Sequence, residues 1–183
     1  MTDNNLPIWR QELKSAIAKE GKSPSSKWVQ LATVNNKNEP RLRTVVFRGW
    51  RTESSLLIFT DKRSKKIEDL KNNPNAELLW FFFKSKRQFR FKGKITELID
   101  NKNYWNRLSD VSKSTWFWKY PGKEISRNLL PPDLIPKNLN KPKNFVVLQF
   151  DILSVDLLKL VQPIHKRYLW EKKYKWNRVE INP

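Results

Sequence analysis

The chain has 183 residues and a formal net charge of +19, with 37 lysines and arginines against 18 aspartates and glutamates. It contains no cysteine, which excludes disulfides, thiolate metal sites and a cysteine nucleophile. A single histidine and four glycines leave no pattern for a metal site, a serine hydrolase or a glycine-rich nucleotide loop. The basic charge favours phosphate-bearing partners: nucleic acid, an anionic membrane or a phosphorylated cofactor.

The length suits one domain, residues 1–183, with a substantial core. The N-terminal sequence lacks the apolar run of a signal peptide, and the longest apolar stretch, Ala76–Phe83, has only the length of a strand. We therefore expect a cytoplasmic protein without a membrane partner.

The first predicted element is a helix that begins at Pro7, with Asn4 and Asn5 as capping candidates, and ends at Gly21. Its apolar positions recur at helical spacing: Trp9, Leu13, Ala16 and Ile17. A second, short helix is expected after Ser64, a favourable N-cap residue, and it should stop at Asn73 and Pro74.

Runs of β-branched and aromatic residues predict the strands. They are Trp28–Val34, Arg41–Trp50, Leu56–Thr60, Ala76–Phe83 and Arg87–Ile99, with three or four more between Phe145 and Ile181. Gly93 is the expected position of a bulge. Residues 101–108 and 114–120 look helical, and Leu129–Asn144, with four prolines, is expected to be irregular. Most consecutive strands lack room for a crossover helix, which indicates an antiparallel, mainly β barrel or sandwich.

The segment DKRSKKIEDL is the main candidate for a phosphate site. A helix start favours anions, so Lys65 and Lys66 in the first turn are costly unless an anion compensates them. Arg43 lies between apolar strand residues and must reach an edge or a partner. Each of these features also has a structural interpretation: a solvated basic helix start, and an arginine that reaches water. Gln88 is equally ambiguous.

Taken in order, the short motifs resemble those of the pyridoxamine 5′-phosphate oxidase family. They are Arg43-Thr44-Val45-Val46-Phe47-Arg48, Ile58-Phe59-Thr60, Ser64-Lys65-Lys66, Asn73-Pro74, Arg87-Gln88, His165-Lys166-Arg167-Tyr168 and the closing segment Trp176–Pro183. The resemblance spans residues 28–183, and the shared order and spacing carry it.

The resemblance implies an antiparallel Greek-key split β-barrel with a few short flanking helices, a homodimer, and FMN bound at the dimer interface. It also implies hydride transfer between a substrate C–H and the flavin N5. The positions that match the family's FMN contacts are Arg43, Thr44, Val45, Val46, Phe59, Thr60, Ser64, Lys65, Lys66, Gln88 and Arg167.

The matched positions on the substrate side are Arg48, Tyr104, Arg107 and His165. Several depart from the family pattern: Arg48 replaces a lysine, Leu108 stands where an arginine is expected, and Pro163 replaces an arginine before His165. Leu157 stands where the family has a late tryptophan. The sequence therefore predicts an FMN-dependent oxidoreductase with an unassigned small-molecule substrate, and it identifies no catalytic residue and no metal ligand.

Two alternatives stay open at this stage. One is a true pyridoxamine 5′-phosphate oxidase. The other is a nucleic-acid-binding barrel, in which Phe89 and Phe91 of the strand KRQFRFKGK stack on bases while its cations contact phosphates. We favour a half-buried strand with a basic outer face over the nucleic-acid interpretation.

Overall fold

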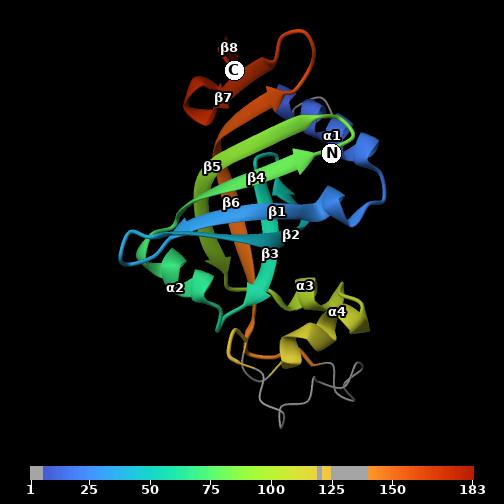
Figure 1. Ribbon diagram of the computed structural model, residues 1–183. Coiled ribbons are helices and arrows are strands. Elements are labelled where there is room, and N and C mark those ends of the chain that lie inside the picture. The colour runs from blue at the N-terminus through green and yellow to red at the C-terminus, as the bar shows by residue number, and fades with distance from the viewer. Residues whose placement is uncertain (1–5, 119–120, 125–139) are drawn as a thin grey trace.

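The computed structural model describes residues 6–118, 121–124 and 140–183, and within them one antiparallel sheet closes into a barrel (Figure 1). The strands are β1 (Trp28–Val34), β2 (Pro40–Thr52), β3 (Ser55–Asp61), β4 (Asn75–Phe82), β5 (Arg87–Leu98), β6 (Phe145–Lys159), β7 (Lys166–Glu171) and β8 (Arg178–Ile181). Their order is β3-β2-β1-β4-β5-β6-β7-β8, and an additional β3–β6 pairing closes the first six into a barrel.

The chain order within the barrel is a Greek key. Strands β1, β2 and β3 follow one another as neighbours, and the chain then returns through α2 (Lys65–Asn72) so that β4 pairs with β1. The long β6 pairs first with β3 and later with β7, which carries β8 out beyond the barrel. This topology confirms the predicted antiparallel split barrel.

Gly93 shows how closely the sheet is packed. The β5–β6 register shifts between Lys92 and Gly93, as the predicted bulge requires. A Cβ atom at Gly93 would lie 2.1 Å from the carbonyl oxygen of Asp151, so only glycine fits there.

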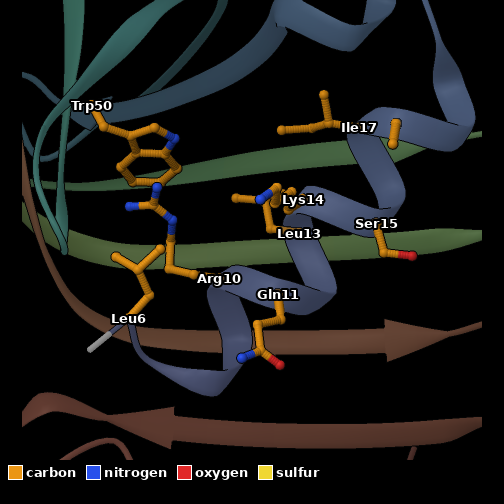
Figure 2. A pocket seen from close by; sticks show the side chains of 9 residues that line it. Leu6, Arg10, Gln11, Leu13, Lys14, Ser15, Ile17 and Trp50 are labelled. Atoms are coloured by element: carbon orange, nitrogen blue, oxygen red, sulfur yellow. The ribbon is translucent and has the colours of Figure 1, made fainter. Parts of the chain in front are cut away.

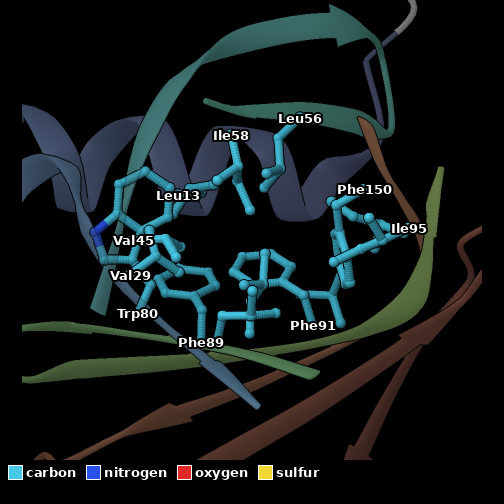
Figure 3. Close-up of a cluster of buried hydrophobic side chains, with 14 of the residues drawn as sticks. Leu13, Val29, Val45, Leu56, Ile58, Trp80, Phe89, Phe91, Ile95 and Phe150 are labelled. Atoms are coloured by element: carbon cyan, nitrogen blue, oxygen red, sulfur yellow. The ribbon is translucent and has the colours of Figure 1, made fainter. Parts of the chain in front are cut away.

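Helix α1 (Ile8–Glu20) ends at Gly21, whose positive φ of 75° suits glycine. Its predicted apolar side is buried, and Leu13 points into the barrel core (Figure 3). The proposed capping residues Asn4 and Asn5 lie outside the described residues. No helix in the described part of the chain is both long and apolar enough to cross a bilayer.

The remaining helical pieces are short. They are α3 (Lys102–Asn106), α4 (Asp110–Ser114), and the 3-10 turns η2 (Pro24–Lys27), η3 (Thr115–Phe117) and η4 (Lys172–Tyr174). The expected irregular segment Leu129–Asn144 lies outside the described residues except for its last five positions. In Figure 1, α3 and α4 lie at the opposite end of the molecule from α1.

Two hydrophobic clusters divide the interior. The larger fills the barrel and contains Trp80, Phe89, Phe91 and Phe150 (Figure 3). The smaller lies outside the barrel wall under α3 and α4, and its buried members are Leu57, Trp105, Trp116, Phe145 and Val147. Because Phe89 and Phe91 are 0 % exposed, neither can stack on a base, and the nucleic-acid interpretation of this strand is wrong.

Candidate functional site

Two cationic side chains meet where α2 packs against the barrel. Lys66, in the first turn of α2, donates through Nζ to Thr60 Oγ1 on β3 at 2.9 Å and to Ser64 Oγ at 3.0 Å. Arg43 reaches the same region from β2, on the sheet face that also carries the buried Val45. We call Arg43, Thr60, Ser64, Lys66 and Asp69 the α2 cluster.

Arg43 is held by buried partners. Its Nη2 donates to Asp69 Oδ2 at 3.2 Å, and its Nη1 donates to Thr33 Oγ1 at 2.5 Å and, at 3.4 Å, to the carbonyl oxygen of Leu31. The guanidinium therefore has a fixed position although its side chain is long and partly exposed.

Burial and neighbouring positive charge disfavour the charged forms of both cations of the α2 cluster. Burial lowers the pKa of Lys66 below its ordinary value, and the nearby charge of Arg43 lowers it further, against the opposing effect of Asp61 and Asp69. Burial also lowers the pKa of Arg43, although Asp69 offsets part of this effect. A bound anion would offset the cost of holding both charges in this place.

Ser64 behaves differently from the sequence prediction. It occupies the N-cap position of α2, but its hydroxyl makes no capping bond and instead donates to the carbonyl oxygen of Asp61 at 2.7 Å. The reason is local, because the hydroxyl is oriented toward the Asp61 carbonyl and its oxygen accepts from Lys66 Nζ instead of a backbone N–H. Lys65, the other predicted contact on this helix, is exposed to solvent.

A pocket of about 340 Å³ lies on the other side of β3, beneath α3. Its lining residues are Arg48, Gly49, Trp50, Arg51, Leu57, Phe59, Tyr104, Arg107 and Leu108. We call it the arginine pocket, because three of these residues are arginines and none is acidic. Three of the four predicted substrate residues and the predicted cofactor residue Phe59 therefore line one pocket.

The arginines of this pocket contact aromatic side chains. The guanidinium carbon of Arg48 lies 5.6 Å from the centre of the Phe59 ring, and that of Arg107 lies 5.8 Å from the centre of the Tyr104 ring. Arg51 Nη1 donates to the Tyr104 hydroxyl at 3.4 Å. Burial lowers the pKa of Arg48. The pocket thus combines aromatic walls with three arginines. A neighbouring cavity that shares Arg51, Tyr104 and Arg107 is also lined by Glu97 and Asp100.

Sequence reasoning missed Arg51. Simple alternation along a strand places residues 48 and 51 on opposite faces. The β2–β3 register, however, shifts between Phe47 and Trp50 and again before Thr52, and Gly49 has a φ of 120°. This irregularity brings both arginines to one pocket, and Gly49 in an arginine-rich strand was the available signal.

Gln88 and Arg167 lie elsewhere, on the outer face of the sheet. Gln88 is paired with Leu158 on β6, and Leu158 is paired in turn with Arg167 on β7. Strands β1 and β4 separate β5 from β2, and Arg43 points to the inner face. Within one protomer, Gln88 therefore lies apart from Arg43 and Lys66, and their shared contact with FMN at a dimer interface stays a prediction. Inner and outer sheet faces keep them apart.

The outer face also holds a charged network. Asp156 accepts hydrogen bonds from Arg90 and from Arg167, whose Nη2 lies 2.7 Å from Asp156 Oδ2. Burial alone would raise the pKa of Asp156, but the bonds from Arg167 and Arg90 outweigh it and leave the pKa lowered. The pKa of Arg167 is raised by the same bond.

The structure changes the interpretation of two strand positions, Leu157 and Val45. Leu157, matched to the family's late tryptophan, is buried in the barrel core, whereas its neighbour Leu158 faces outward between Gln88 and Arg167. Val45, matched to an FMN contact, also turns its side chain into the core, so only its backbone can reach a ligand. Thr44 and Val46 take the outer face by alternation.

His165 is exposed, and its Nδ1 lies 3.0 Å from the carbonyl oxygen of Val161. With Arg167 and Ile181 it lines a pocket of about 490 Å³ that shares no residue with the arginine pocket. Within one protomer, His165 therefore does not join the other predicted substrate residues.

A pocket of about 790 Å³ lies along α1 and contains none of the predicted site residues (Figure 2). Arg10 stacks over the Trp50 indole there, with its guanidinium carbon 3.5 Å from the ring centre. In the described ranges, no group of three histidine, cysteine or acidic residues is arranged to hold a metal ion.

The chain belongs to the family of the pyridoxamine 5′-phosphate oxidase FMN-binding domain, whose model matches residues 6–99. A solved pyridoxamine 5′-phosphate oxidase-related, FMN-binding protein from Nostoc punctiforme PCC 73102 is 31% identical. It superposes with a TM-score of 0.85 over 98% of this chain and 100% of that one. PhzG from Burkholderia lata 383, at 16% identity and a TM-score of 0.79 over 96% of this chain and 91% of that one, shares the fold.

Similar full-length proteins include a pyridoxine/pyridoxamine 5′-phosphate oxidase 2 from Arabidopsis thaliana, 41% identical over 110 residues, which are 60% of this chain and 55% of the relative. A pyridoxine/pyridoxamine 5′-phosphate oxidase from Psychrobacter arcticus is 32% identical over 124 residues, 66% of this chain and 55% of that protein. The matched part spans about half the length of these curated relatives.

Proposed function

We propose that the chain binds FMN, with the FMN phosphate in the α2 cluster. The observation that carries the proposal is the approach of Lys66 and Arg43, two partly buried cations whose pKa values are both lowered. A dianionic phosphate compensates that charge, and Lys66 Nζ and the Arg43 guanidinium are the donors that would hold it. When bound, FMN supplies hydride chemistry at its N5.

We further propose that the protein works as a homodimer in which the partner completes the flavin site. Large apolar side chains of the sheet are exposed: Trp28 on β1, Leu42 on β2 and Val179 on β8 are each at least half exposed, as is Phe83 in the turn after β4. An open apolar surface of this kind supports burial against a second copy. Gln88 and Arg167 lie on the outer face of the sheet, so a partner would add them to the flavin site.

The arginine pocket supports an organic anion as the substrate. Arg48, Arg51 and Arg107 supply positive charge, while Phe59 and Tyr104 supply flat surfaces for a ring. Leu108 and Arg107, which follow α3, both line the pocket, and Leu108 also packs against the smaller hydrophobic cluster. We propose a flavin-dependent oxidoreductase whose substrate specificity differs from that of the oxidases it resembles.

The test is a titration of the purified, flavin-free protein with FMN and with riboflavin, followed by flavin fluorescence. Tighter binding of FMN than of riboflavin, with sedimentation as a dimer, supports the proposal. Equal affinity for the two flavins would show that the phosphate lies outside the α2 cluster. Turnover of pyridoxamine 5′-phosphate, measured as peroxide release, then tests how far the specificity has diverged.

A further inference from the structure

A buried carboxylate lies behind the guanidinium of Arg43. Asp69, on α2, is 3 % exposed, and its Oδ2 accepts hydrogen bonds from Arg43 Nη2 at 3.2 Å and from Thr33 Oγ1 at 2.8 Å. Thr33 is also buried and accepts the 2.5 Å bond from Arg43 Nη1. The three side chains form a closed triangle that links β1, β2 and α2.

The triangle limits the freedom of Arg43. A free arginine side chain has many rotamers, and a flexible arginine would lose that conformational entropy each time it bound a phosphate. Asp69 and Thr33 engage Nη1 and Nη2 from the protein side, so this entropy is already lost in the folded chain. The guanidinium is then held in one orientation, close enough for its charge to act on Lys66.

We propose that Asp69 is a positioning residue that fixes Arg43 for the phosphate of the flavin. The inference rests on the proposed function, since it concerns the same α2 cluster. Asp69 does not contact the ligand. It acts through Arg43, and Thr33 completes the geometry from the neighbouring strand.

Simple electrostatics predicts the opposite effect. A carboxylate next to a phosphate site repels the ligand, so neutralising Asp69 would strengthen FMN binding if charge alone mattered. If Asp69 positions Arg43, removing its oxygens weakens FMN binding instead. The sign of the change therefore separates the two roles.

The experiment compares Asp69→Ala with Asp69→Asn, using FMN and riboflavin as the two probes. We expect Asp69→Ala to weaken FMN binding at least about tenfold and to leave riboflavin affinity unchanged, because one charge-assisted phosphate contact is lost. Asp69→Asn keeps an oxygen acceptor for Arg43 and Thr33, so it should stay within about threefold of the parent. Glu68→Gln, on the exposed side of the same helix, is the matched charge control.

Thr33→Val provides a second route if Asp69→Ala does not fold. It keeps the side-chain shape, removes the hydroxyl, and should weaken FMN binding several-fold without affecting riboflavin. Unchanged or tighter FMN binding by Asp69→Ala, or by Thr33→Val where Asp69→Ala does not fold, would overturn the inference. A parent protein that fails to prefer FMN over riboflavin would instead refute the proposed function on which the inference rests.

Discussion

The α2 cluster and the arginine pocket are both rich in positive charge, but they differ in the acidic side chains placed beside that charge. In the α2 cluster, Asp69 is buried against Arg43. Asp61 lies close enough to oppose the lowering of the pKa of Lys66. The arginine pocket has three guanidiniums and no acidic lining residue. Rigid internal partners suit a site that holds one proposed cofactor, whereas a pocket without an acidic lining residue leaves its charge to the molecule that enters.

The largest effect should come from removing both cations of the α2 cluster. Arg43→Ala combined with Lys66→Ala loses two charge-assisted contacts to phosphate, each worth about 1.5–3 kcal/mol, so FMN affinity should fall at least about 100-fold. Flavin fluorescence titration measures this, with riboflavin affinity expected to stay constant. Lys65→Ala, an exposed lysine of the same turn, is the control. Parent-like FMN affinity in the double variant would place the phosphate elsewhere.

The arginine pocket should respond to a different ligand. Arg51→Ala removes one of its three guanidiniums, and binding of pyridoxamine 5′-phosphate to the flavin-loaded protein should weaken about tenfold, as for one charged hydrogen bond. FMN affinity should not change. Perturbation of the flavin spectrum gives both values, and Lys102→Ala on α3, outside the pocket lining, serves as control. A loss of FMN affinity without a loss of anion binding would reverse the roles assigned to the two regions.

We expect Lys66 to lower the free energy of unfolding of the flavin-free protein. Because its pKa is lowered by burial and by Arg43, the protonated amine is disfavoured in the fold at neutral pH. Lys66→Met should raise the free energy of unfolding of the flavin-free protein, by less than about 1 kcal/mol, since bonds to Thr60 and Ser64 are lost too. Denaturant unfolding measures the change, and the same variant should bind FMN more weakly. A destabilised variant would mean that the hydrogen bonds outweigh the charge.

The smallest expected effect is on stability at acid pH, through Asp61 beside the α2 cluster. Burial tends to raise the pKa of Asp61, but hydrogen bonds from Arg63 and Asn144 outweigh it, so the folded pKa lies below the ordinary 3.8. The carboxylate therefore stabilises the fold above that value, and this contribution disappears as the pH falls through the folded pKa. Asp61→Asn should flatten the pH dependence of the free energy of unfolding in this acid range. An unchanged slope would assign the acid sensitivity to other carboxylates.

Part of the α2 cluster could be predicted from the sequence because three of its members lie close together along the chain, whereas Arg43 comes from the separate strand β2. Thr60, Ser64 and Lys66 surround one strand-to-helix turn, so local geometry brings them together. Asp69 and Thr33 were not predicted, because their role depends on the packing of α2 against β1. Arg51 was missed because the irregularity in β2 interrupts the alternation from which the face of each side chain is predicted.

By itself, the sequence determined the kinds of contact that are available: strands of alternating apolar residues, a helix start with two lysines, and no cysteine or histidine cluster for other chemistry. Those features depend on local propensity and side-chain chemistry, which neighbouring residues define. Only the tertiary structure decided which face of the sheet each residue occupies. It places Arg43 inside and Gln88 outside, because strand order and register bring distant segments together in ways that no local pattern records.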